Sequence, residues 1–196
     1  MKTLCFTGKR PKELLGYSYS QNYAEFIQWL SQYLETLYYD GITNFISGGA
    51  QGFDQLAFSA VALLKAKYPD IRNIVYVPFS GQHLKWSTNP NTPFSQSAYN
   101  QMLSQADEVK YLYEVNPSDF GKVRTALMNR NHDMVDASDI VVALYPNDDY
   151  QSGTGGTAEC MRYATKQHKT MYQIKYIIQD NRIVPTNTIL HYNAAK

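Results

Sequence analysis

Cysteine is scarce in this chain, which carries only Cys5 and Cys160 among its 196 residues. Two thiols so far apart in the sequence provide neither a disulfide framework nor a set of metal ligands. We therefore expect reduced thiols and no metal site, and the sequence indicates no cofactor.

Long apolar runs and an excess of charge of one sign are also missing. No segment approaches the roughly 20 apolar residues that span a bilayer, and the apolar strand after Met1-Lys2 is too short for a signal peptide. Lysine and arginine number 18 against 17 acidic residues, giving a net charge of +1. This balance argues against a general nucleic-acid or membrane-surface binder. We expect a cytoplasmic protein with no membrane partner.

Strand-like and helix-like segments alternate along the chain. The hydrophobic fraction of 44% and the charged fraction of 18% are typical of a soluble globular protein. Alternation of this kind predicts an α/β fold, a Rossmann-like three-layer sandwich with a mostly parallel central sheet. The predicted strands are 4–7, 44–47, 73–77, 109–112, 139–145 and 171–174, and the predicted helices are 22–39, 54–68, 92–106, 122–137 and 158–169.

A single domain over residues 1–196 accommodates these elements. We place its core at about 1–174, followed by a C-terminal β-pair or tail over 175–196. Asp180-Asn181 suits the turn of a terminal hairpin, and the last dozen residues are weakly patterned.

A glycine-rich turn, Ser152 to Glu159, joins the apolar strand 139–145 to an amphipathic helix. Glycines here let the backbone approach a ligand, and the first amides of the helix point at it with the positive end of the helix dipole behind them. The turn therefore predicts an anion seat, most plausibly for phosphate. The alternative is a flexible surface turn that is merely rich in Gly and Thr.

A second glycine turn, 48–54, follows strand 44–47 and opens the next helix. Both turns, the Lys9-Arg10 pair and the loop at Pro78 follow strands, so they lie on the rim where open α/β sheets bind ligands. Neither turn matches GxGxxG or the P-loop well. Asp54 is suited either to ribose hydroxyls or to stabilising the start of its helix.

Arg130, on the helix predicted at 122–137, presents a planar donor fork that fits phosphate or carboxylate. The alternative is a structural salt bridge. The chain also has 17 tyrosines; Tyr33, Tyr38 and Tyr39 share one helix and indicate packing or a subunit interface rather than base stacking.

Taken together, these motifs resemble the YpsA-like branch of the SLOG superfamily, which includes the LOG phosphoribohydrolases and the DNA-processing protein DprA. The resemblance runs from the first strand to about Lys169. Its motifs are Cys5 to Pro11, Ser47 to Asp54, Arg130-Asn131 with Met134 to Asp136, Ser138-Asp139, and Gly155 to Thr157.

The resemblance implies a domain that binds a nucleotide or a nucleotide-derived molecule and forms homodimers or larger assemblies. In LOG enzymes an Arg and a Glu cleave the base–ribose bond; carried over, these are Arg130 and Glu159. The chain departs from the LOG motif, because Asn131 replaces a lysine, Ser152 a proline and Thr154 a glycine. Alignment on Gly156-Thr157 places Cys160 at the glutamate position, with Glu159 one residue early, which is about 100° around a helix.

Three functions follow in order of preference: nucleotide binding in a sensing, sequestering or regulatory role, LOG-like phosphoribohydrolase activity, and DprA-like binding of single-stranded DNA. The last would use Lys9, Arg10, Lys85, Lys122 and Arg124, and the near-neutral charge counts against it. The predicted ligand-binding residues are Thr7, Gly8, Arg10, Gly48, Gly49, Ala50, Gly52, Asp54, Pro78, Asn131, Gly153, Thr154, Gly155, Gly156 and Thr157, with Arg130 and Glu159 as the catalytic pair.

Overall fold

A seven-stranded sheet runs through the centre of the computed structural model, which describes residues 1–18 and 22–191. The strand order is β4-β3-β2-β1-β5-β6-β7; all neighbouring pairs are parallel except β6 and β7, which are antiparallel. The strands are β1 (Lys2–Gly8), β2 (Ile42–Ser47), β3 (Arg72–Phe79), β4 (Glu108–Tyr113), β5 (Ile140–Leu144), β6 (Thr170–Gln179) and β7 (Arg182–His191).

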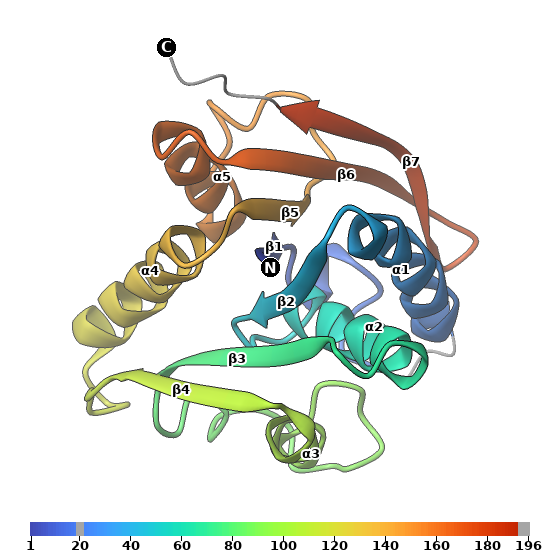
Figure 1. Ribbon diagram of the computed structural model, residues 1–196. Coiled ribbons are helices and arrows are strands. Elements are labelled where there is room, and N and C mark those ends of the chain that lie inside the picture. The colour runs from blue at the N-terminus through green and yellow to red at the C-terminus, as the bar shows by residue number, and fades with distance from the viewer. Residues whose placement is uncertain (19–21, 192–196) are drawn as a thin grey trace.

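Helices cover both faces of this sheet, which confirms the predicted three-layer fold (Figure 1). One layer contains α1 (Asn22–Tyr39) and α2 (Phe53–Lys67), with α3 (Gln96–Gln105) against α2; the other contains α4 (Phe120–Asp136) and α5 (Gly156–Lys166). A short 3-10 helix, Pro11–Glu13, follows β1.

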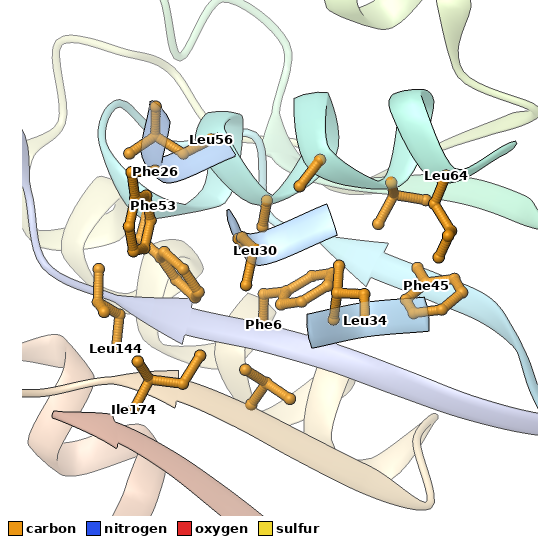
Figure 2. Close-up of a cluster of buried hydrophobic side chains, with 14 of the residues drawn as sticks. Phe6, Phe26, Leu30, Leu34, Phe45, Phe53, Leu56, Leu64, Leu144 and Ile174 are labelled. Atoms are coloured by element: carbon orange, nitrogen blue, oxygen red, sulfur yellow. The ribbon is translucent and has the colours of Figure 1, made fainter. Parts of the chain in front are cut away.

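Three hydrophobic clusters hold the layers together. The two larger ones lie on opposite faces of the sheet, because successive side chains of a buried strand point to opposite faces. Leu4 and Phe6 of β1 pack with Leu30 of α1 and Phe53 of α2, in the cluster that Figure 2 shows. Cys5, between them in sequence, joins the cluster under α4 and α5. The central strands β1, β3 and β5 are therefore buried on both faces, as is typical of apolar strands in a parallel sheet.

The bounds of most elements differ from the prediction by a few residues, and two differences are larger. Helix α3 begins at Gln96 rather than at residue 92, because the Ser95 hydroxyl accepts a hydrogen bond from Ala98 N and caps it there. Strands β6 and β7 are longer than expected: β7 extends through the weakly patterned segment to His191, where its half-exposed edge position weakens the alternation. Asp180 and Asn181 form the predicted turn, both with positive φ.

The order of the strands reverses between β1 and β5. From β1 the chain builds outward through β2, β3 and β4, and from β5 it builds the other way through β6 and β7. Loops that leave two adjacent strands in opposite directions open a crevice at their carboxyl ends, where ligands of such folds bind. The loops after β1 and β5 meet at this point.

Candidate functional site

A small polar pocket of about 150 Å³ lies at this reversal point. It brings together the segments that follow β1, β2 and β5 with one side of α4. Of the predicted site residues it is lined by Thr7, Gly8, Arg10, Ala50, Asp54, Arg130, Asn131, Thr154, Gly155, Gly156 and Thr157, and it adds Lys9, Glu13 and Gln51. We call it the anion pocket.

The start of α5 forms one wall of the anion pocket. Gly155 precedes the helix with φ of 90°, and its position carries no side-chain cap. Apart from its own chain neighbours, no atom of the described residues lies within 4 Å of a Cβ placed on Gly155. For Gly156, leaving out its neighbours and the backbone of its own helix, the nearest atom is Asn131 Nδ2 at 3.8 Å. The first turn of α5 is therefore open to the pocket, with its amides and the positive end of the helix dipole available to an anion.

Arg130 lies beneath the pocket and is only 3% exposed. Its Nη1 is 3.5 Å from Asp54 Oδ2, and its Nε donates to Asn131 Oδ1 at 3.0 Å. Burial lowers the pKa of Arg130, and the Asp54 carboxylate opposes this effect. Both sequence interpretations of Arg130 meet here, since it pairs with an acid and also lines the pocket. The pair is long for a charge-assisted hydrogen bond, so Arg130 can still bind an anion.

The glycines of the turn 48–52 do not line the anion pocket. A Cβ on Gly48 would lie 1.5 Å from Arg130 Nη1, and one on Gly52 would lie 2.5 Å from the Lys9 carbonyl oxygen. Gly49, with φ of 65°, packs against Tyr99 and other side chains. These glycines admit other parts of the protein rather than a ligand. The turn contributes Ala50, Gln51 and Asp54 to the pocket instead.

Cations from the loop after β1 complete the pocket. Lys9 Nζ is 2.8 Å from Glu13 Oε1 and 4.8 Å from the centre of the Tyr145 ring. Arg10 Nη1 makes one long hydrogen bond, 3.5 Å, to the Gln51 carbonyl oxygen. The sequence placed Lys9 on the ligand-binding rim beside Arg10 and among the possible DNA contacts, but the predicted ligand-binding residues did not include it.

Glu159 points away from the anion pocket toward α4. Its Oε1 lies 2.6 Å from His132 Nε2, and the His132 ring stacks on Tyr163 with centroids 3.8 Å apart. The LOG alignment places Cys160 at the glutamate position. Cys160 is only 2% exposed, and this burial raises the pKa of its thiol. The anion pocket is lined by neither Glu159 nor Cys160, so neither candidate for the LOG glutamate position reaches it.

A larger groove adjoins the anion pocket between α4 and α5. We call it the α4–α5 groove; its volume is about 520 Å³. It shares Arg10, Arg130, Asn131, Gly155 and Gly156 with the anion pocket. Its other lining residues are Phe120, Val123, Arg124, Leu127, Met128, Glu159 and Arg162.

Besides Gly48, Gly49 and Gly52, two more predicted site residues lie outside both cavities. Pro78 is buried within β3. Gly153 packs inward, because a Cβ there would lie 2.2 Å from the Tyr145 hydroxyl, and its carbonyl accepts a hydrogen bond from Arg162 Nη1 at 2.7 Å. Arg162 also binds the Tyr150 and Gln151 carbonyls, so it fixes the approach to the glycine turn.

Comparison with known proteins assigns the fold to a family. The YpsA profile, described as the YspA SLOG family, matches residues 4–181. The chain belongs to this SLOG family. The match includes every segment that lines the anion pocket and the α4–α5 groove. Within the described residues of this SLOG protein, no three His, Cys, Asp or Glu side chains gather as metal ligands, and no helix has the length and apolarity of a membrane span.

The curated relatives cover most of the chain. The SPbeta prophage-derived protein YoqJ of Bacillus subtilis is 34% identical over 133 residues, which are 64% of this chain and 71% of YoqJ. A UPF0398 protein of Bacillus cereus is 29% identical over 150 residues, 74% of each chain.

Two solved structures of DNA processing protein A share the fold. The Helicobacter pylori protein, described for its single-stranded DNA binding mode, superimposes with a TM-score of 0.54 at 18% identity and covers 92% of this chain and 68% of its own. The Streptococcus pneumoniae protein gives 0.53 at 14% identity over 92% of this chain, which spans about half (52%) of that protein.

Proposed function

We propose that this SLOG protein binds a nucleotide or a related phosphorylated riboside, with the phosphate seated in the anion pocket. The observation that supports this most is the uncapped, sterically open start of α5 facing a pocket that also holds Arg130 and Arg10. Backbone amides, a helix dipole and guanidinium groups at one point form a site suited to phosphate.

The role we propose is sensing, sequestering or regulation rather than catalysis. Cleavage of a base–ribose bond needs a carboxylate placed at the ribose. Glu159 does not line the anion pocket; it lines the α4–α5 groove, where its Oε1 is hydrogen-bonded to His132 on α4. The enzymatic alternative is phosphoribohydrolase activity with Arg130 and Glu159. Incubation of the protein with AMP tests it: release of free adenine by wild type but not by Glu159→Gln would favour the enzyme over the binder.

Isothermal titration calorimetry with AMP and ribose 5-phosphate tests the binding proposal. We expect both to bind wild-type protein, and we expect Gly156→Asp to weaken both at least tenfold. The new carboxylate would stand at the first residue of α5, where it suits the helix dipole and so preserves folding, but repels phosphate.

Ser97→Asp is the matched control. It adds the same charge near the start of α3, on the other face of the sheet, and should leave both affinities unchanged. Absence of binding by wild type at millimolar ligand, or equal binding by wild type and Gly156→Asp, would contradict the proposal.

Single-stranded DNA is the second candidate ligand. Two observations favour it: the fold is shared with DNA processing protein A, and the exposed Arg124 extends the cationic surface of the anion pocket along the α4–α5 groove. A gel shift with a poly-dT oligomer at low salt tests it, because phosphate contacts give binding that falls steeply as salt rises. The net charge of +1 still favours the small nucleotide.

Self-association belongs to the same proposal, following the SLOG resemblance. Native mass spectrometry of freshly purified protein would report both the number of subunits and the mass of any ligand retained. Tyr39 on α1, 70% exposed and hydrogen-bonded to Tyr68, offers a surface at which a second copy could pack.

A further inference from the structure

We infer that the α4–α5 groove is the subsite for the base of the nucleotide, so that the ligand extends from the anion pocket along α4. This inference rests on the proposed function and goes beyond it by assigning the groove and the aromatic part of the ligand. Three observations support it: the sizes of the two cavities, the composition of the groove and its direction.

The anion pocket alone is too small for a whole nucleotide. Its volume of about 150 Å³ falls below the roughly 300 to 1,000 Å³ that is typical of sites for drug-sized ligands. The groove, at about 520 Å³, falls within that range. Since the two cavities share five lining residues, a ligand with its phosphate at the start of α5 extends most directly into the groove.

The groove offers an apolar wall and a guanidinium group. Phe120 is 75% exposed and Met128 is 39% exposed, and both line the groove. Lys85 Nζ lies 4.6 Å from the centre of the Phe120 ring. Arg124 is exposed and, within the part of the chain that the structure describes, forms no hydrogen bond or ion pair.

This composition favours a planar heteroaromatic ring over an alkyl chain. Aromatic side chains and arginine planes both stack on bases, whereas a lipid-like tail would gain nothing from a charged guanidinium. The groove therefore holds, in Phe120 and Arg124, both side-chain types that stack on bases.

The direction of α4 connects the two subsites. Phe120, Arg124, Leu127 and Asn131 recur every three or four residues, so they lie on one side of the helix. Asn131 borders the anion pocket, and Arg124 lies about 10 Å farther along the helix axis at a rise of about 1.5 Å per residue. A phosphate at Asn131 and a base beside Leu127 and Arg124 place one ligand along this side.

Comparing AMP with ribose 5-phosphate by isothermal titration calorimetry isolates the base. We expect wild type to bind AMP roughly 5- to 160-fold more tightly, the range that stacking of one base at about 1–3 kcal/mol provides. Phe120→Ala should remove most of this advantage while leaving the affinity for ribose 5-phosphate unchanged. Because Phe120 is exposed, the variant should fold, and Leu127→Ala is a second variant with the same expected pattern.

Tyr111→Ala, which removes an exposed aromatic ring from β4 outside both cavities, should change neither affinity. Equal affinities of wild type for the two ligands, or equal loss of both in Phe120→Ala, would overturn the subsite while leaving the proposed function standing. If neither ligand bound wild type, the proposed function itself would fail and the subsite with it.

Discussion

The two glycine turns of the rim look alike in sequence and differ in use. In the turn after β2, Gly48 and Gly52 make room for the Arg130 side chain and the Lys9 backbone. In the turn after β5, Gly155 and Gly156 face open space at the start of a helix. The first turn is filled by the protein, and the second is left for a ligand. Adjacent glycines therefore mark a close approach of something to the backbone, without saying whether that is protein or ligand.

Gly48→Ala should have the largest effect on stability. Its Cβ would lie 1.5 Å from Arg130 Nη1 and 2.7 Å from Asp54 Oδ2, both buried. Overpacking of this kind costs about 1–3 kcal/mol and here also separates a charged pair, so we expect about 3 kcal/mol or more. Urea denaturation measures this loss.

The same substitution made on an Arg130→Met background should be less destabilising, because the clash involves the guanidinium itself. A loss below about 1 kcal/mol in the single variant would mean that the first turn is as open as the second.

Arg162→Met should have the next largest effect. It removes the hydrogen bonds from Nη1 to the carbonyls of Tyr150, Gln151 and Gly153 while keeping the aliphatic stem. We expect a loss of about 1.5–3 kcal/mol and faster amide exchange in residues 150–153. Arg124→Met, at an exposed side chain, should stay within about 0.5 kcal/mol of wild type. Equal stabilities of the two variants would show that the glycine turn after β5 does not depend on the hydrogen bonds of Arg162.

Gly155→Ala and Gly156→Ala should have opposite signs. Gly155 has φ of 90°, where an added side chain costs about 1–2 kcal/mol. Gly156 is the first residue of α5, and alanine there should stabilise the protein by about 0.4–1 kcal/mol by restricting the unfolded chain. Thermal unfolding of both variants checks this pair, and a loss of stability in Gly156→Ala would contradict the open surroundings of that position.

Acid should lower the stability of the protein near the glycine turn after β2, through protonation of His83. Its ring stacks on Tyr99, which packs against Gly49, and burial lowers the pKa of His83. A histidine with a folded-state pKa below its unfolded value of about 6.5 contributes stability above that pH, and this is lost as the pH falls through the folded value. His83→Gln should therefore flatten the fall in urea midpoint between about pH 7.5 and pH 5.

A slope that persists unchanged in His83→Gln would assign the effect to other groups. His191 is one of these, since burial lowers its pKa in the same direction. Its ring bonds Gln173 on β6 and packs edge-on against Tyr150, just before the second glycine turn.

Local patterns in the sequence predicted most of the fold. Apolar strands and helical spacing located the first six strands and the five α-helices. The rule that parallel strands end on one rim brought Thr7, Arg10, Asp54 and Thr154 together. The sequence missed the length of β7, because an edge strand with one half-exposed face alternates weakly.

Local sequence patterns could not predict that one glycine turn is filled by protein while the other stays open. It depends on where Arg130 lies, and Arg130 reaches Asp54 from 76 positions away. The direction of Glu159 likewise depends on His132 of another helix, a contact that no spacing within α5 predicts. Long-range packing of charged side chains decides both.

The Arg130 guanidinium occupies the space beside Gly48 that a side chain would need. The residues that can stand at positions 48 and 130 therefore depend on each other. A lineage that keeps the arginine can place no larger residue at position 48, whereas a lineage that shortens position 130 becomes free to drift there. Substitutions at the two positions should therefore appear together among descendants, with the change at 130 arising first.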